Sequence, residues 1–139
     1  MRIAIFLAAA LFALPAPADE LEREFVYQVR FCEGMHMGVD LGSVGTADCT
    51  SDALAIEVGF FSKWKEDLGQ SLAYAAAAGL RPGMISICDR DQGDCYRYDQ
   101  GLQQTAAAFG LALEVWECLP TDMELSECHH LTLGPNGGQ

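Results

Sequence analysis

A mostly apolar run from Leu54 to Phe60, followed directly by a helix-forming stretch, constrains the fold of this chain more than any other feature. Strands that are apolar on both faces are typical of a sheet interior with other elements packed on each side. The next segment, residues 63–78, has helical periodicity, with Ser62 as its expected N-cap and Gly79 at its end. A buried strand that leads into a helix predicts an α/β fold.

Further elements follow from similar patterns on either side of this pair. Residues 19–31 repeat Leu21, Phe25 and Val29 every four positions, which predicts a helix with that stripe buried. We also expect a hairpin strand over 37–44 that returns through 46–49, strands over 84–88 and 111–118, and a helix from Asp99 to Phe109. The tail, residues 119–139, contains Pro and Gly residues and is expected to be irregular. The prediction is a three-layer α/β/α sandwich with a central mixed sheet over residues 19–118.

The first 18 residues have the pattern of a signal peptide. Arg2 precedes an apolar run, Ile3 to Leu14, and Ala16-Pro17-Ala18 forms an A-x-A cleavage site. That run is too short to span a bilayer. An uncleaved anchor is the alternative, but the charged run that starts at Asp19 favours cleavage. We therefore expect a periplasmic or secreted protein with no membrane association after cleavage.

The chain is strongly acidic, with 20 Asp and Glu residues against 8 Lys and Arg residues and a net charge of −12. Cleavage would remove Arg2 alone among these residues, so the mature chain would carry about −13. Such a chain repels polyanions, whereas nucleic-acid-binding proteins usually carry a basic surface. The composition therefore disfavours nucleic acid as a partner, and the sequence identifies no protein partner.

Six cysteines in a small exported chain indicate a disulfide framework. We favour the nearest-neighbour pairs, Cys32–Cys49, Cys88–Cys95 and Cys118–Cys128, because each closes a short loop between or after predicted elements. A zinc site is the alternative, but its clustered ligands, Cys128-His129-His130, are adjacent and do not easily converge on one ion. The acidic segment 89–94 lacks the bidentate Glu of an EF-hand loop, so we interpret it as a polar turn.

Glu57 is the sharpest local anomaly, because it stands in the middle of the apolar strand. A buried carboxylate is costly unless it is paired or binds a cation. Asp48 lies upstream, and its carboxylate would converge on Glu57 if residues 46–49 pair beside the strand. Two carboxylates with several waters suit Mg²⁺. Two alternatives stay open: Glu57 meets solvent or Lys63 at the strand's end, or Asp52 replaces Asp48 as the second ligand.

The helix after the strand carries a polar stripe. Lys63, Asp67, Gln70 and Tyr74 follow the spacing of one helical face, and that face is not the apolar one. A polar stripe is normally a solvated surface. Because this one begins directly after the strand that bears Glu57, its first turns would overhang that strand's end, where Lys63 would stabilise a developing negative charge.

Taken together, these residues resemble the active-site segment of a small subgroup of PD-(D/E)XK nucleases. The resemblance covers roughly residues 30–118 and is most specific through 48–83. It is carried by Asp48-Cys49, Ala55-Ile56-Glu57-Val58-Gly59-Phe60, Lys63-Trp64, Gly69-Gln70, Tyr74 and Arg81-Pro82-Gly83.

The resemblance implies a PD-(D/E)XK-like fold in which Asp48 and Glu57 bind the metal ion. Lys63 would stand in for the motif lysine, displaced from the strand to the helix. Gln70 and Tyr74 would match a Q-x-x-x-Y motif on the helix and complete the catalytic set. Gly59 departs from the pattern, because neither a lysine nor an acid stands at that position.

Two functional hypotheses follow from these observations. The first is an exported Mg²⁺-dependent phosphodiesterase or nuclease, favoured by the retained motif residues. The second is a catalytically inactive binding or structural domain on the same fold, favoured by Gly59 and the acidic charge. The electrostatic environment of Glu57 discriminates between them. A basic rim formed by Arg30, Lys63, Lys65 and Arg81 would favour the enzyme, and an acidic rim the binding domain.

Overall fold

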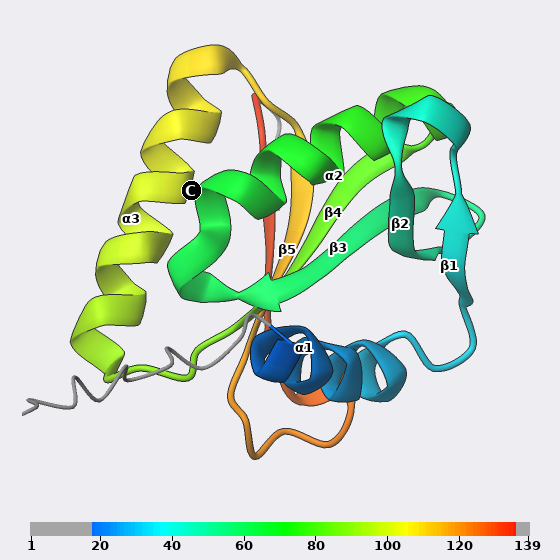
Figure 1. Ribbon diagram of the computed structural model, residues 1–139. Helices are drawn as coiled ribbons and strands as arrows, with labels where there is room; N and C mark the ends of the chain where they lie inside the picture. Colours follow the sequence, from blue (N-terminus) through cyan, green and yellow to red (C-terminus); the bar gives the residue numbers. More distant parts are fainter. Residues whose placement is uncertain (1–17, 136–139) are drawn as a thin grey trace, which may run out of the picture.

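The computed structural model describes residues 18–135, so the expected signal peptide, apart from Ala18, lies outside the described residues. These residues form an α/β fold with three α-helices and a mixed six-stranded sheet (Figure 1). The helices are α1 (Ala18–Phe31), α2 (Trp64–Ala78) and α3 (Gln92–Phe109). The strands are β1 (His36–Asp40), β2 (Thr46–Thr50), β3 (Leu54–Phe60), β4 (Arg81–Ile87), β5 (Leu113–Cys118) and β6 (His129–Leu133).

The strands lie in the sheet in the order in which they occur in the chain. Strands β1, β2 and β3 form an antiparallel meander, and β3, β4 and β5 run parallel to one another. Strand β6 then pairs antiparallel with β5. Parallel strands need crossover connections, and α2 and α3 supply them. The carboxyl ends of β3, β4 and β5 therefore meet at one edge of the sheet.

Both faces of the sheet are covered by apolar packing, as the run in β3 predicts. On one face, Ile56, Val58 and Phe60 pack in a cluster with Phe31 of α1. On the other face, Leu68 of α2 and Leu102 of α3 pack with residues of β4 and β5. In Figure 1, α1 lies on the opposite side of the sheet from α2 and α3. Residues that alternate along β3 therefore face different helices.

The packing of α1 differs from the expected one. Phe25 and Val29, expected to be buried, are 57% and 49% exposed. The helix instead contacts the sheet through Tyr27 and Phe31, and the Tyr27 ring meets Phe60 edge-on. Tyr27 and Phe31 place two aromatic rings on one face, whereas the other face has one ring and Val29, so the face with more aromatic area to bury meets the core. This rotation brings Glu24, expected to face solvent, towards the sheet.

All three expected disulfides are present. Cys32–Cys49 ties the end of α1 to β2, and Cys88–Cys95 ties the end of β4 to α3. Cys118–Cys128 joins the end of β5 to the segment before β6. Disulfides of this kind are typical of proteins in oxidising compartments outside the cytoplasm. Among the described helices, none is long and apolar enough to cross a membrane.

Three local expectations are wrong. Ser62 does not cap α2, because a 3-10 turn over Phe61–Lys63 precedes that helix and Lys63 occupies the cap position. The third helix begins at Gln92 rather than after Asp99, with Asp91 accepting a hydrogen bond from the Asp94 N–H as its N-cap. The tail is not irregular throughout, since residues 129–133 form β6 against β5.

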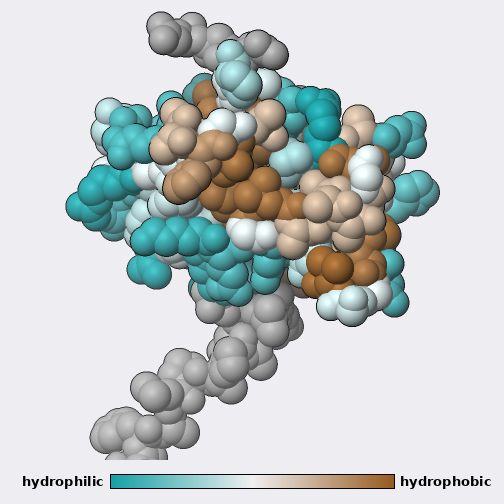
Figure 2. Space-filling model, turned by 90° about the horizontal axis from the view of Figure 1, so that it is seen from above, coloured by the Kyte–Doolittle hydropathy of each residue, from teal (hydrophilic) through white to brown (hydrophobic). Residues whose placement is uncertain are grey.

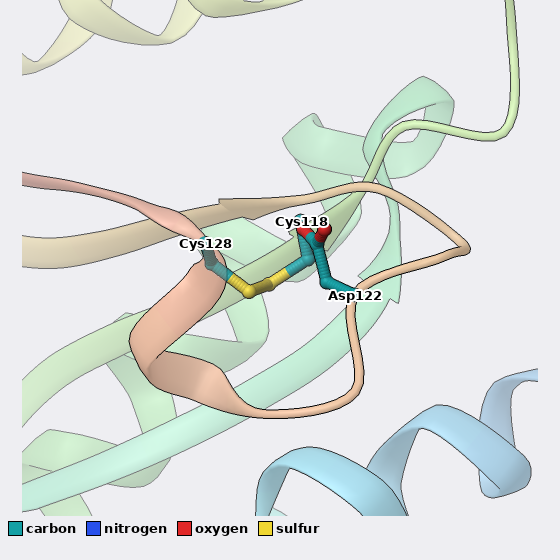
Figure 3. A group of neighbouring side chains, drawn as sticks. All are labelled: Cys118, Asp122 and Cys128. Carbon is teal, nitrogen blue, oxygen red and sulfur yellow. A yellow bond between two sulfur atoms is a disulfide. The ribbon is translucent and has the colours of Figure 1, made fainter.

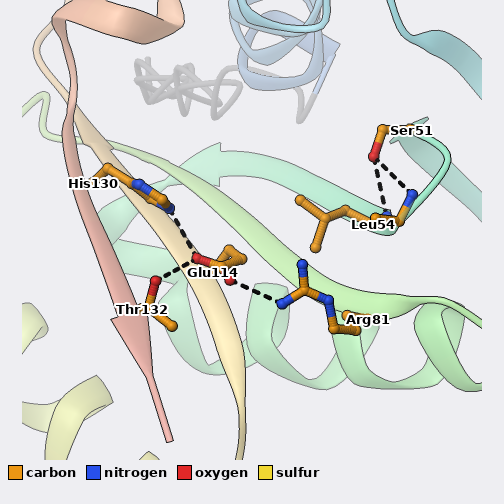
Figure 4. Close-up of polar contacts among 7 residues, drawn as sticks. Ser51, Leu54, Arg81, Glu114, His130 and Thr132 are labelled. Atoms are coloured by element: carbon orange, nitrogen blue, oxygen red, sulfur yellow. Dashed lines mark hydrogen bonds and ion pairs between the residues drawn. The ribbon is translucent and has the colours of Figure 1, made fainter. Parts of the chain in front are cut away.

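The turn between β2 and β3 is closed by Ser51, not by Asp52. The Ser51 hydroxyl oxygen accepts hydrogen bonds from the backbone N–H groups of Ala53 and Leu54 (Figure 4). Asp52 is exposed at this turn. Asp52 therefore lies at the tip of the hairpin, away from the neighbours of Glu57 described below.

The surface is acidic overall but carries an apolar band on one side. Figure 2 shows this band on the face seen from above, the side on which α2 lies in Figure 1. Ala73, Ala76 and Ala77 of α2 are exposed on this side. The inward face of α2 is formed instead by Leu68, Ser71 and Ala75.

Candidate functional site

A cavity of about 400 Å³ lies between α1, β2, β3 and α2. Its lining brings together all five residues singled out by the sequence, Asp48, Glu57, Lys63, Gln70 and Tyr74. The remaining lining residues are Glu24, Phe25, Gln28, Val58, Glu66 and Asp67. The predicted site residues therefore share one cavity.

The cavity opens where β2 and β3 separate. The two strands pair only at Cys49–Ile56 and Thr50–Ala55. Beyond that point the Asp48 side chain replaces the neighbouring strand, because its Oδ2 accepts a hydrogen bond from the Val58 N–H at 2.8 Å. Gln28 of α1 donates to the Asp48 carbonyl oxygen at 2.7 Å. These contacts fix Asp48 at the mouth of the gap between the strands.

Glu57 lies on the face of β3 that α2 covers, and it is buried, with 8% of its surface exposed. Its carboxyl group is hydrogen-bonded to the side chain and to the backbone of Asp48. Its Oε2 atom is buried and has no hydrogen-bond partner. A buried oxygen without a partner is costly, which makes Glu57 the chemically least satisfied group at this site.

The carboxyl groups of the cavity suppress one another's ionisation. Burial, followed by the charges of Asp48, Asp67 and Glu24, raises the pKa of Glu57 far above its usual range. Burial also raises the pKa of Asp48, with a smaller contribution from Glu24. In the absence of a cation, a shared proton between Asp48 and Glu57 relieves their repulsion.

Asp67, which the sequence placed only on the polar stripe, occupies the space beside Gly59. A Cβ atom at position 59 would lie 2.9 Å from the Asp67 Cγ, closer than real contacts allow. Asp67 is buried, and its Oδ2 has no hydrogen-bond partner. Burial and the charges of Glu24 and Glu66 raise the pKa of Asp67 to about 7. The acid missing from position 59 is thus replaced in space by one from α2.

Lys63 is ion-paired with Glu24 of α1. Its Nζ lies 3.0 Å from the Oε1 of Glu24, and the Lys63 side chain is about one-third exposed. Glu24 is a site residue that the sequence analysis missed, because it stands among several acids in an ordinary amphipathic pattern. Glu24 reaches the cavity because α1 is rotated relative to its expected orientation.

Gln70 and Tyr74 lie further along α2 and form the far wall of the cavity. The Tyr74 ring packs against Gly45, where a Cβ would lie 2.9 Å from the Tyr74 hydroxyl oxygen. Burial and the nearby charges of Glu57 and Asp48 raise the pKa of Tyr74. The phenol therefore stays protonated and can donate a hydrogen bond into the cavity.

The basic rim that would favour the enzyme does not form. Arg30 donates hydrogen bonds to the carbonyl oxygens of Pro120 and Asp122, and Arg81 pairs with Glu114. Lys65 lies over the Trp64 ring. Lys63 is the one basic residue among those that line the cavity, which also has five acidic residues, Glu24, Asp48, Glu57, Glu66 and Asp67. The local potential at Glu57 is therefore negative.

A second group of possible metal ligands lies elsewhere. Ligand atoms of Cys118, Asp122 and Cys128 lie within 4.8 Å of one another (Figure 3). However, the two cysteines form a disulfide, and Asp122 accepts a hydrogen bond from the Leu119 N–H at 2.7 Å. Thiolates, not disulfides, are the usual metal ligands. This group stabilises a turn, and no other three ligand residues in the described chain converge as closely.

The alternative zinc cluster is also absent from the described residues. Cys128 is oxidised, and the two neighbouring histidines contact different carboxylates. His129 lies 3.3 Å from Glu117, whereas His130 lies 2.9 Å from Glu114. The acidic segment before α3 supplies the Asp91 helix cap, as a polar turn would.

Comparison of the chain with family models, with curated proteins and with solved structures gives no significant match.

Proposed function

We propose that this protein is an exported, disulfide-stabilised domain with a PD-(D/E)XK-like three-layer architecture, which binds a divalent cation and does not cleave nucleic acid. One observation carries the proposal. Glu57 is 8% exposed, its Oε2 has no hydrogen-bond partner, and it contacts a second carboxyl group at Asp48. A cation at this position would satisfy that oxygen and remove the repulsion between the two acids.

The arrangement suits Mg²⁺ better than an ion that requires many protein ligands. Mg²⁺ commonly binds one or two carboxylates and keeps several waters. Asp48 and Glu57 supply two carboxylates, and the cavity of about 400 Å³ leaves room for waters. Asp67 and Glu24 are then close enough to the same cavity to accept hydrogen bonds from such waters.

The acidic lining argues against nucleic acid as the substrate. A phosphodiester backbone would approach five carboxyl side chains and one lysine, and that lysine is ion-paired with Glu24. Gly59 offers no side chain, and Asp67 fills the adjacent space with another acid. These features favour cation binding without phosphoryl chemistry.

Thermal unfolding tests the cation site directly. The purified chain without residues 1–18 should melt at a higher temperature in Mg²⁺ or Mn²⁺ than in NaCl of equal ionic strength, since a ligand that binds the native state stabilises it. Glu57→Gln should abolish that rise. Glu66→Gln removes the same charge from an exposed residue of the same cavity and should retain the rise. Absence of a shift in the unmodified chain would refute the cation site.

A Mg²⁺-dependent phosphodiesterase is the second candidate, favoured by the convergence of Lys63, Gln70 and Tyr74 on the same cavity. Mg²⁺ in such a site activates water and stabilises negative charge on a phosphate. Lys63 and Tyr74 would position the phosphate. Incubation with single- and double-stranded DNA distinguishes the candidates. Cleavage that is lost in both Glu57→Gln and Lys63→Ala would establish the enzyme and overturn the first proposal.

A further inference from the structure

A second cavity, of about 380 Å³, lies at the carboxyl ends of the parallel strands. Phe61 follows β3, Cys88 follows β4, and Glu117 and Leu119 lie at the end of β5. The first turns of α3 close the opposite side through Tyr96 and Asp99. In open α/β sheets, the crevice outside the carboxyl ends of parallel strands is the usual place for a ligand. This cavity shares no lining residue with the one around Glu57.

The walls of this second cavity are largely apolar. Phe61 is buried beneath it, and Tyr96 and Leu119 are exposed at its mouth. Two disulfides, Cys88–Cys95 and Cys118–Cys128, contribute sulfur atoms to the wall and fix its shape. A cavity of this size with apolar walls and a few polar groups has the character of a small-molecule site.

Four acids line the cavity, and three of them have structural partners. Asp122 accepts from the Leu119 N–H, and Glu127 accepts from the N–H groups of Met123 and Glu124. Both carboxylate oxygens of Asp99 accept from Gln103, at 2.7 and 2.8 Å.

Glu117 differs from these acids. One of its oxygens, Oε2, lies 3.3 Å from the Nδ1 of His129. The other oxygen, Oε1, is buried and has no hydrogen-bond partner. Burial, together with the contact to Asp99, raises the pKa of Glu117 to about 7. A positively charged donor is the group that would satisfy Oε1 and favour the ionised carboxylate.

We propose that this second cavity binds a small organic ammonium ion, a primary amine with an apolar body, whose nitrogen donates to Glu117 and whose body packs against Phe61, Tyr96 and Leu119. Charge complementarity favours this ligand class. Four acids, Asp99, Glu117, Asp122 and Glu127, line the cavity, and His129 is the one basic residue in its lining. An anionic ligand would face those acids, and a bare metal ion would find one unpartnered carboxylate oxygen and apolar walls.

Three probes of one shape test the charge requirement. 2-Phenylethylamine is the cation, 2-phenylethanol the neutral analogue and phenylacetate the anion. Each is titrated into the isotopically labelled chain near neutral pH, where the amine is protonated, and backbone amide NMR shifts are followed. We expect saturable shifts with the amine around Tyr96, Leu119 and His129. We expect binding of the alcohol to be at least about tenfold weaker, because it lacks the charge-assisted hydrogen bond.

Two variants locate the site. Glu117→Gln should weaken amine binding by about tenfold or more while retaining the fold, which the same spectra report. Tyr96→Ala changes an exposed side chain, so it should fold normally and weaken both amine and alcohol binding. Glu66→Gln, the same charge change at the first cavity, should leave binding unchanged. Equal affinity for the amine and the alcohol would overturn the proposal, as would unchanged amine affinity in Glu117→Gln.

Discussion

At the residue scale, Gly59 of β3 and Asp67 of α2 are paired in space. The carboxyl group of Asp67 comes from α2 and lies in the space that a side chain at position 59 would need. A side chain at position 59 and the Asp67 carboxyl group cannot occupy this space together. Glycine at position 59 therefore allows Asp67 to be buried here. Residues that compete for the same space show non-additive effects on stability.

This coupling predicts the outcome of a double-mutant cycle. Gly59→Ala should destabilise the protein by roughly 1–3 kcal/mol, because its Cβ forces Asp67 out of its position. The same substitution in an Asp67→Ala background should cost much less, since the space is then free. Urea unfolding of the four proteins measures the coupling. An equal cost of Gly59→Ala in both backgrounds would contradict the exclusion argument.

Site residues could be predicted from the sequence where a residue type is unusual for its element. Glu57 stood out because an acid interrupts an apolar strand, and Asp48 followed from the expected strand pairing. Glu24 and the position of Asp67 were not predictable. They depend on the rotation of α1 and on the space beside Gly59, neither of which leaves a periodic signal.

At the element scale, β6 depends on the disulfide that precedes it. This strand lies at the edge of the sheet and pairs only with β5. Cys118–Cys128 joins the two strands across a sequence separation of 10 residues. The sequence of β6, His129 to Leu133, contains few apolar side chains that could pack against the rest of the protein. This is also why β6 was not predicted. The covalent link limits how far β6 can move from β5.

Removing that disulfide should loosen β6 selectively. The double substitution Cys118→Ser/Cys128→Ser should lower the free energy of unfolding by about 3 kcal/mol, as expected for a loop of this length. Hydrogen exchange of the β6 amides should accelerate more than that of β3. Cys88→Ser/Cys95→Ser opens a loop of similar length elsewhere and serves as the control. Uniform acceleration throughout the sheet would contradict a local role for Cys118–Cys128.

A polar cluster links three strands on one side of the sheet (Figure 4). Glu114 of β5 accepts hydrogen bonds from Arg81 at the start of β4 and from Thr132 of β6, and it contacts His130 at 2.9 Å. Burial alone would raise the pKa of Glu114, but the hydrogen bonds from Thr132, His130 and Arg81 together lower it. The ionised carboxylate is therefore the form that the cluster stabilises.

This shift gives the contribution of Glu114 a defined pH dependence. A lowered pKa in the folded state means that the cluster stabilises the protein above the usual pKa of a glutamate. That stability is lost as the pH falls through the lowered value. Glu114→Gln should cost about 1–3 kcal/mol at neutral pH and progressively less in acid. Urea unfolding over a pH series measures this, and a cost that grows in acid would refute the assignment.

How accurately each element was predicted from the sequence depends on how much of its surface is buried. Strand β3 was predicted to the residue, because burial on both faces leaves an apolar run broken only by Glu57 and Gly59. Helix α3 starts earlier than predicted because its first turn is polar and is held by Cys88–Cys95 and the Asp91 cap. The face of α1 was misjudged because it has apolar residues on two sides. Sequence periodicity does not say which of two such faces meets the sheet.

At the scale of the whole molecule, the acidic charge acts on the folded state. With 20 acidic and 8 basic residues, the chain has a net charge of −12, and five of the acids line the first cavity and four the second. Self-repulsion of this kind destabilises a compact state, and dissolved salt screens it within a Debye length. Exposed acids far from either cavity should contribute to this effect as well as the buried ones.

The last prediction separates this general effect from cation binding at Glu57. Raising NaCl from about 10 mM to about 500 mM should increase the melting temperature by several degrees, since the Debye length falls from about 30 Å to a few ångströms. Reversing two exposed charges, with Glu33→Lys/Asp52→Lys, should reduce that increase, and Glu33→Gln/Asp52→Asn should reduce it by about half as much. Because neither residue lines the cavity around Glu57, both variants should keep the additional rise that Mg²⁺ causes at equal ionic strength. Differential scanning calorimetry measures both rises in melting temperature. If charge reversal leaves the rise caused by NaCl unchanged, self-repulsion of the acidic residues does not limit stability. If charge reversal removes the rise caused by Mg²⁺ as well, Mg²⁺ acts by screening alone.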